Sequence, residues 1–451
     1  MLGTMKMTRL VPQISVPIMI SMLVQALYNV VDSIFVSRWD TRGLTAVSLA
    51  YPVQMLMPAL AVGMGVGINS LISRKLGEHD PEAARRAGWN GVFIEVCGFV
   101  LFFIVGCFSG PLMNLLVSDN LSDAAYIREL GATYLSIVTM ASIGAFMAIC
   151  FERMLQSTGN TVASMITQLC GAVANMILDP IMIFGMFGLP EMGVAGAAWA
   201  TILGQLISMT VGFVLNQTRN PELKLRLKEF ALDKRSLKGI ITVGLPSTVM
   251  QAISSVMNVG MNGILSGFAE VGNDAVNVLN IYFKLQSFIF MPVFGLGNGM
   301  VAIIGYNFGA RLKERVYEAV KVALVYAACI MLFGTLLFQL LPEQLMSLFE
   351  SEESAQMTAI GVTALRTISW HFIIAAVGVT LSNVFQAVGK GSYSLIVSLC
   401  RQLVVLLPAA WLLSRVSLEA VWWSFCVAEI ISLALCLLFY RRCDRKMLSK
   451  L

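Results

Sequence analysis

Two short patterns of oxygen-bearing side chains in the first half of the chain have the spacing of a helix face. Gln25, Asn29 and Asp32 stand at positions i, i+4 and i+7, and Asn175 and Asp179 stand at i and i+4. Residues with these spacings lie on one side of a helix. Carboxylate and amide oxygens suit a proton or a hard cation such as sodium better than a soft metal. The two patterns therefore indicate an ion site.

These side chains fall inside long apolar runs, which identifies the solvent around the helices that must position them. The chain has 451 residues, of which 57% are hydrophobic and 13% are charged, whereas charged residues make up about 25% of ordinary soluble domains. The apolar runs are roughly 20 to 28 residues long, the length that crosses a bilayer as a helix. The sequence predicts an all-α membrane protein with twelve transmembrane helices. The predicted ranges are 10–36, 44–72, 89–117, 126–152, 161–186, 193–217, 239–266, 275–304, 317–341, 358–388, 391–414 and 418–440.

Depth in the membrane groups four of the polar residues together. An ionisable group in hydrocarbon costs at least about 2.5 kcal/mol, so each one needs a partner or a purpose. At about 1.5 Å per residue from the outer helix ends, Asp32 lies at about 7 Å, Asp179 at about 10 Å, Thr201 at about 12 Å and Asn175 at about 16 Å. We predict that these four form a cation-coupling site, with Na⁺ as one possible occupant. The alternative is that Asp179 manages the helix disturbance at Pro180 and that Asp32 makes one interhelical hydrogen bond.

The second half carries different polar groups. Lys284 either contacts substrate in a cleft between two lobes or pairs within its own lobe, and His371 either relays protons or is a hydrogen-bonded packing residue. Arg401 and Glu429 lie at similar depth on neighbouring spans, which predicts a buried ion pair with a structural role. Six polar residues, each within a predicted span, are candidates for contacting substrate in the cleft: Gln25, Asn29, Asn258, Asn280, Lys284 and His371.

The two halves of the chain are similar to each other. Residues 17–58 align with 246–292 at an offset of about 229 positions, which pairs Pro17 with Pro246. After a small gap, Gly63 pairs with Gly297. The second half keeps this scaffold but lacks the acids, since Asp32 aligns with a methionine. The predicted ion site therefore belongs to the first half alone.

An even number of spans in each copy determines the symmetry. Both copies enter the membrane in the same direction, so the pseudo-twofold axis runs along the membrane normal. We predict an N-lobe in residues 1–216, a cytoplasmic linker in 217–238 and a C-lobe in 239–451. Placing both termini in the cytoplasm also puts most lysine and arginine residues there.

Composition excludes several other classes of function. The net charge of +5 is explained by topology, so no nucleic-acid partner is expected. The nine cysteines lie almost all in apolar runs without a C-x-x-C pair, so neither a metal centre nor a cofactor is expected. No convincing nucleophile or pair of catalytic acids is present near a surface, so the protein is not expected to be an enzyme.

Several motifs give the chain a resemblance to the multidrug and toxic compound extrusion (MATE) family, and in particular to its prokaryotic DinF-type branch. They are Asn175-Met-Ile-Leu-Asp179-Pro, Gly193-Val-Ala-Gly196-Ala-Ala-Trp-Ala-Thr201, and Gln156-Ser-Thr-Gly159 with its repeat Gln386-Ala-Val-Gly389. The resemblance covers nearly the full length. It implies a two-lobe exporter of amphipathic, often cationic drugs, and Asp32, Asn175, Asp179 and Thr201 match the family's N-lobe cation site.

The sequence thus predicts a multidrug efflux transporter that works by proton- or sodium-coupled antiport with alternating access of its two lobes. We expect a monomer in the inner cell membrane, with the bilayer and a small drug-like molecule as its partners. A flippase for lipid-linked precursors is the alternative within the same superfamily. A channel is harder to exclude from the sequence.

Overall fold

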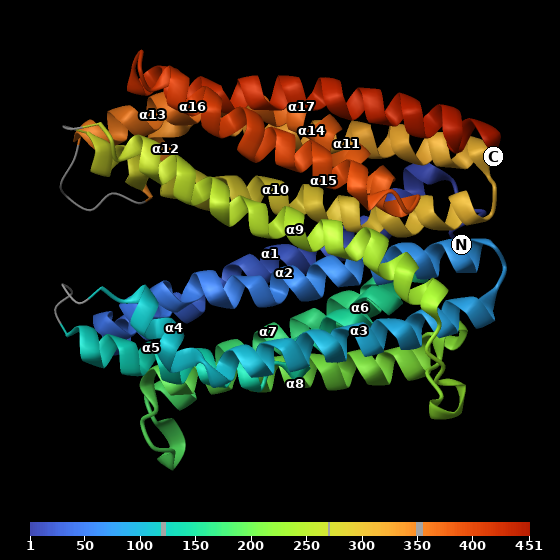
Figure 1. Cartoon of the computed structure of the whole chain (residues 1–451), viewed down its shortest axis with the longest axis horizontal. Coiled ribbons are helices and arrows are strands. Elements are labelled where there is room, and N and C mark those ends of the chain that lie inside the picture. Colours follow the sequence, from blue (N-terminus) through green and yellow to red (C-terminus); the bar gives the residue numbers. More distant parts are fainter. Residues whose placement is uncertain (119–122, 269–270, 349–354) are drawn as a thin grey trace. The chain divides into compact units, whose positions relative to one another are not determined.

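The computed structural model describes residues 1–118, 123–268, 271–348 and 355–451, and over these residues the chain is helical, without strands (Figure 1). The helices of the first half are α1 (Met7–Trp39), α2 (Thr41–Gly77), α3 (Pro81–Cys107), α4 (Ser109–Leu116), α5 (Ala124–Met140), α6 (Ile143–Ser157), α7 (Thr161–Ile183) and α8 (Gly193–Arg219). Those of the second half are α9 (Lys234–Leu265), α10 (Gly272–Gly309), α11 (Lys313–Leu340), α12 (Pro342–Ser347), α13 (Ala355–Ser369), α14 (His371–Ala387), α15 (Gly391–Leu399), α16 (Leu407–Leu413) and α17 (Leu418–Lys446). A π-helical turn, Cys400–Leu406, joins α15 to α16.

The helices have the lengths that a bilayer requires. Ten helical segments of the described residues are long and apolar enough to cross a membrane, with α15, the π-helical turn and α16 counted as one segment. The number reaches 12 when two bent pairs each count as one span. The bends are 43° between α5 and α6 and 47° between α13 and α14. They fall at equivalent points of the two halves, so the repeat extends to the break in the fourth span of each half. The predicted fold class is confirmed.

Polar caps define where several helices begin. Asp40 precedes α2 and accepts a hydrogen bond from the Arg42 backbone N–H, and Asp80 does the same for Ala83 at the start of α3. These side chains satisfy backbone donors that the first turn leaves unpaired. Asp233 caps α9, and hydrogen bonds from the Ser236 side chain and from backbone N–H groups hold the pKa of its carboxyl below the usual range.

Contacts divide the chain into two units whose boundaries lie inside helices. Unit 1 comprises Met1–Met19 and Val249–Leu451, and unit 2 comprises Ile20–Thr248. The sequence instead predicted a single boundary between the lobes, at the linker 217–238. The difference arises because the first residues of α1 pack within unit 1 and the first residues of α9 pack within unit 2.

Glycines on α2 allow the start of α9 to pack closely within unit 2. A Cβ added to Gly63 would lie 2.5 Å from the backbone nitrogen of Thr248, and one added to Gly67 would lie 3.0 Å from that of Gly244. Only hydrogen fits at these positions without moving the neighbouring backbone. This is the small-residue packing that membrane helices use to bring their backbones together.

Unit 1 repeats this arrangement with α10 and the start of α1. A Cβ on Gly295 would lie 2.8 Å from the Met19 Cα, and one on Gly299 would lie 2.7 Å from the Ser15 Oγ. Met19 and Ser15 align with Thr248 and Gly244 at the offset that relates Pro17 to Pro246. Gly63 therefore corresponds to Gly295, two positions before the glycine with which the sequence alignment paired it.

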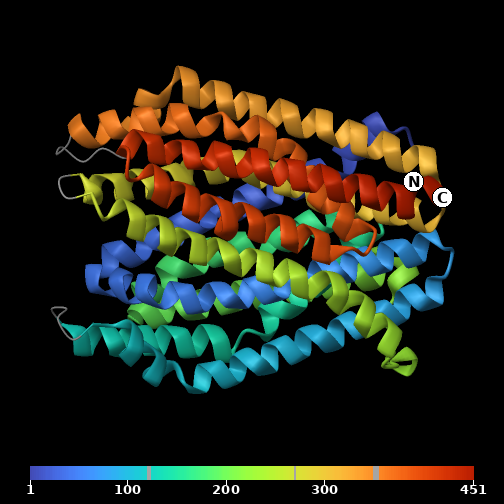
Figure 2. The same ribbon diagram turned by 45° about the horizontal axis from the view of Figure 1, so that its top comes forward.

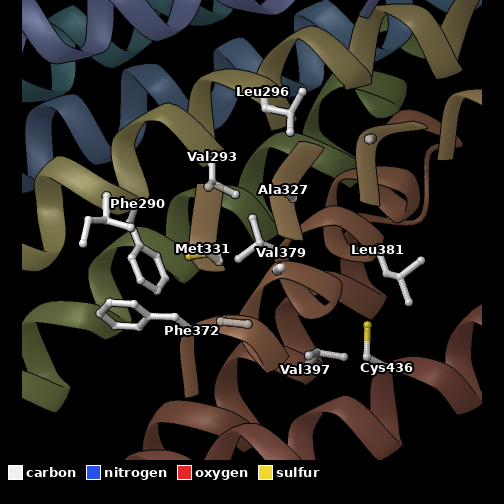
Figure 3. Packing of buried hydrophobic residues seen from close by; sticks show 14 of the residues in the cluster. Phe290, Val293, Leu296, Ala327, Met331, Phe372, Val379, Leu381, Val397 and Cys436 are labelled. Atoms are coloured by element: carbon white, nitrogen blue, oxygen red, sulfur yellow. The ribbon is translucent and has the colours of Figure 1, made fainter. Parts of the chain in front are cut away.

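The helices of each unit run side by side around an apolar core (Figures 1 and 2). In unit 1 the rings of Phe290 and Phe372 meet edge-on, with centroids 5.3 Å apart (Figure 3). The ring of Phe338 also meets that of Phe372 edge-on, at 5.2 Å. In unit 2 the rings of Phe102 and Phe146 lie 6.0 Å apart. Because lipid is as apolar as these side chains, close packing rather than escape from water favours such contacts.

Candidate functional site

Close packing of α7 against α8 creates the setting of the predicted ion site in unit 2. A Cβ on Gly204 of α8 would lie 2.8 Å from the Gly171 carbonyl oxygen and 3.1 Å from the Asn175 Cβ of α7. The two backbones therefore approach as closely as glycine permits. As a result, side chains one turn away on both helices come within hydrogen-bond distance.

Asn175 connects the polar residues of these two helices. Its Nδ2 donates to Asp179 Oδ1 at 3.3 Å and to Thr201 Oγ1 at 3.4 Å. The Thr201 hydroxyl donates to the Ala197 carbonyl at 3.0 Å. Asp179 is completely buried, with 0% of its surface exposed. Three of the four predicted site residues thus form one hydrogen-bonded group.

Asp32 of α1 interacts with the same group. Its carboxyl acts electrostatically on that of Asp179, and the hydroxyls of Tyr28 and Tyr134 lie within electrostatic range of both acids. The structure therefore brings the carboxyl groups of α1 and α7 into one neighbourhood. Two acids that share a buried site favour binding of a proton or a small cation.

Several oxygens of the site have no hydrogen-bond donor among the described residues. These are Asp32 Oδ1, Asn175 Oδ1 and Asp179 Oδ2, and all three are buried. A buried polar atom without a partner costs about 1–3 kcal/mol, and more when it is charged. A proton, a sodium ion or water would remove that cost. The ligand set consists of oxygen atoms only, which fits a hard cation.

Sequence reasoning missed the aromatic and amide residues beside the acids. Tyr28 precedes Asp32 by one helical turn, so its place on the polar face of α1 was visible in the spacing. Tyr134 of α5 donates to Gln54 Oε1 of α2 at 3.3 Å. The bond between Tyr134 and Gln54 joins two helices, so only the packing of the helices revealed this pair.

The remaining candidate of the first half with a described side chain lies deeper on the same helix face. Gln25 Oε1 accepts a hydrogen bond from Gln168 Nε2 of α7 at 2.6 Å, so α1 and α7 meet through polar groups at this level too. Asn29 lies on α1 between Gln25 and Asp32, but its side chain is outside the described residues.

The structure does not gather the second-half candidates into one group. Asn258 is half-buried on α9, and its Oδ1 has no hydrogen-bond partner among the described residues. Asn280 and Lys284 are exposed one turn apart on α10. His371 is 4% exposed and packs among the rings of Phe290, Phe372 and Phe425.

His371 has the surroundings of a packing residue. Its Nδ1 lies 2.6 Å from the Ile368 carbonyl oxygen, which gives the ring a hydrogen bond across the bend between α13 and α14. The predicted pair of Arg401 and Glu429 is also present, with 3.5 Å between Nη1 and Oε1. Arg401 belongs to the π-helical turn. Such a turn changes the direction in which the side chains that follow it point from the helix axis.

Comparison with known proteins follows the same division into two repeats. The sequence profile of the family described as MatE matches residues 17–181 and 246–412. The multidrug export protein MepA of Staphylococcus saprophyticus is 26% identical over 97% of this chain and 94% of its own length. MepA of Staphylococcus aureus is 24% identical over 96% of this chain and 93% of its own length.

A solved structure agrees over the whole chain. It is the outward-facing conformation of a multidrug resistance MATE family transporter of the MOP superfamily, with 27% identity and a TM-score of 0.91. The match covers 100% of this chain and 98% of the other. This likeness in sequence and fold to multidrug transporters makes the chain a secondary transporter of the membrane rather than an enzyme. The chain belongs to the MATE family, as its double match to the family profile shows.

Proposed function

We propose that this chain exports amphipathic, cationic small molecules in exchange for protons or sodium ions, and that Asp32, Asn175, Asp179 and Thr201 bind the coupling ion. The observation that carries the proposal is the set of buried oxygens on α1 and α7 that lack donors among the described residues. Multidrug export is supported by the relatives, which are themselves named as multidrug exporters. They favour drug export over flipping of lipid-linked precursors.

Ion binding drives export if it changes how α1 fits against α7. With both acids ionised, the shared site carries uncompensated negative charge that polar or solvated surroundings must offset. A bound proton or sodium ion neutralises that charge, so the polar faces of α1 and α7 pack together more closely. A drug cation that prefers the ionised state is then released. The two lobes alternate between inward and outward access as the occupant changes.

The proposal also covers the oligomeric state, the location and the residues that contact the drug. The transporter acts as a monomer in the inner cell membrane, and both termini lie in the cytoplasm. Gln25, Asn29, Asn258, Asn280 and Lys284 contact the drug. His371 is a weaker candidate for drug contact, because three aromatic rings surround it.

The test is transport by purified protein in vesicles. A fluorescent cation is followed while a pH gradient and a sodium gradient are imposed separately. Asp32→Asn and Asp179→Asn are expected to abolish ion-driven efflux, and the gradient that drives the wild type identifies the ion. Glu78→Gln, at an exposed acid that pairs with Lys75, is the matched control and keeps wild-type transport. Wild-type efflux in both aspartate variants would refute the site, and flux that needs no gradient would indicate a channel.

A further inference from the structure

A second group of buried ionisable side chains lies in unit 2, away from the site described above. Glu95 of α3 is 1% exposed and Arg153 of α6 is 4% exposed. The two act on each other electrostatically, and neither Asp32 nor Asp179 is among the groups that act on them. The pair is therefore a separate electrostatic centre within the first half.

Hydrogen bonds extend this centre to a second acid and to α7. Arg153 Nη1 donates to Gln156 Oε1 at 2.9 Å. The Gln156 Nε2 donates to Glu152 Oε1 at 3.0 Å and to Ser164 Oγ of α7 at 2.9 Å. Two polar atoms stay without partners among the described residues, namely Glu95 Oε1 and Arg153 Nε. Among the described residues, one donor, Arg153 Nε, and one acceptor, Glu95 Oε1, of the network are therefore unpaired.

Counting charges shows what this network would bind. It contains the carboxyl groups of Glu95 and Glu152 but one guanidinium, that of Arg153. A single positive charge balances a single carboxylate, and a second ionised carboxylate in a buried site is costly. The charge-balanced state therefore carries one proton on one of the two acids.

The internal repeat shows that the fold does not need this pair of charges. A Cβ on Gly65 would lie 2.9 Å from Arg153 Cγ, and one on the equivalent Gly297 would lie 2.7 Å from Asn383 Cγ. Asn383 thus occupies in unit 1 the place that Arg153 occupies in unit 2. The alignment of α3 with α11 puts the buried Ala327 at the place of Glu95. The acid and the arginine are therefore missing together from the half that lacks the ion site.

One face of α7 leads from this centre to the ion site. Ser164, Gln168, Asn175 and Asp179 follow one another at spacings that keep them on one side of the helix. Ser164 and Asp179 are separated by about 22 Å along the axis at about 1.5 Å per residue. Between them, Gln168 donates to Gln25 of α1.

We propose that Glu95, Glu152 and Arg153 form a second proton-binding site, which passes the coupling proton between the Asp32–Asp179 site and the membrane surface at the other end of α7. The inference rests on the proposed antiport, with the proton as the coupling ion. In each cycle a carboxylate of the second site accepts a proton and later releases it to water. No other bond forms or breaks.

The surroundings of Glu95 restrict what else controls its proton. The groups of α6 that interact with it are Arg153 and Cys150, and Glu152 acts on Arg153. The helices α2, α4 and α5 and the short segment Pro221–Leu223, which carries Glu222, also pack against α3. Among the described residues, no charged group of these elements acts on Glu95. At the Arg153 side, α2 contributes Gly65.

The first test is the pH dependence of thermal stability in detergent. If the native site holds a proton that the unfolded chain releases, the native state binds more protons near neutral pH, so the melting temperature falls as pH rises. Glu95→Gln, which mimics the protonated acid, should flatten that fall. The triple variant Glu95→Ala/Glu152→Ser/Arg153→Asn copies Ala327, Ser382 and Asn383 of the second half, so it should fold and show the same flat profile. An equal loss of stability at every pH, parallel to the wild-type profile, would show that Glu95 is only an ionised partner of Arg153.

The second test is transport driven by a pH gradient in vesicles. The triple variant should lose proton-driven efflux while it keeps wild-type affinity for the fluorescent cation. If Asp32→Asn loses efflux and the triple variant transports like the wild type, the second site is wrong and the antiport stands. If Asp32→Asn itself transports like the wild type, the proposed antiport fails first.

Discussion

Replacing Gly204 with alanine tests whether the close approach of α7 and α8 sets the geometry of the ion site. The new Cβ would lie 2.8 Å from the Gly171 carbonyl oxygen, whereas ordinary contact begins at 3.4 Å, so the helices must separate by about 0.6 Å. The same Cβ would lie 3.1 Å from the Cβ of Asn175 and would push on it directly.

Displacement of this size is large compared with the tolerance of the site. The hydrogen bonds from Asn175 to Thr201 and Asp179 are 3.4 Å and 3.3 Å long, already near the outer limit for N–H···O bonds. Overpacking of a close-packed contact costs about 1–3 kcal/mol. If that cost falls on the ion-bound state, the affinity for the coupling ion drops by about 5- to 150-fold.

The assay is drug efflux from vesicles as a function of the concentration of the driving ion. Gly204→Ala should raise the half-maximal ion concentration by this factor. Gly263→Ala is the matched control, because a Cβ at that position of α9 meets no atom within 4 Å. Alanine there should leave transport unchanged and stabilise the helix by about 0.5–1 kcal/mol. A wild-type ion dependence in well-folded Gly204→Ala protein would refute the link between helix approach and ion binding.

Three further predictions concern stability. His371→Gln should lower stability by about 1–3 kcal/mol through lost packing and a lost hydrogen bond, with unchanged transport per folded molecule; reduced transport at equal folding would restore the proton relay. Gly63→Ala and Gly295→Ala should lower the melting temperature to a similar extent, because both force a Cβ against the backbone of a neighbouring helix. The pKa of Asp233 is lowered in the fold, so its capping contribution is present above the unfolded pKa and is lost as pH falls through the folded value. The protection factor of the Ser236 amide, which is the intrinsic exchange rate at each pH divided by the observed rate, should therefore fall in acid, and Asp233→Asn should remove this pH dependence.

Local signals in the sequence were enough to locate the spans. The predicted range 193–217 became Gly193–Arg219 and the predicted range 161–186 became Thr161–Ile183. Such boundaries follow from the length of apolar chain that a bilayer requires, which is a property of each segment alone. The bends at 140–143 and 369–371 were not predicted. No proline stands at either bend, so they arise from the way the segments pack.

The candidate site was predictable in part for the same reason. Asp32, Asn175, Asp179 and Thr201 were found from spacing and depth, and the structure brings them together in unit 2. Tyr134 and Gln54 were missed, because their hydrogen bond joins α5 to α2 and forms only when the two helices pack together. The alternatives for His371 were likewise open until its aromatic neighbours were known.

By itself, the sequence determined the membrane class, the duplication and the polar faces of individual helices, because periodicity and run length are written into contiguous residues. Only the tertiary structure decided that Glu95 meets Arg153, that Gly63 corresponds to Gly295, and that the starts of α1 and α9 belong to units other than those that the linker suggested. These facts depend on how each helix is rotated and tilted against its neighbours. Packing between segments far apart in the chain sets that rotation, and no single segment encodes it.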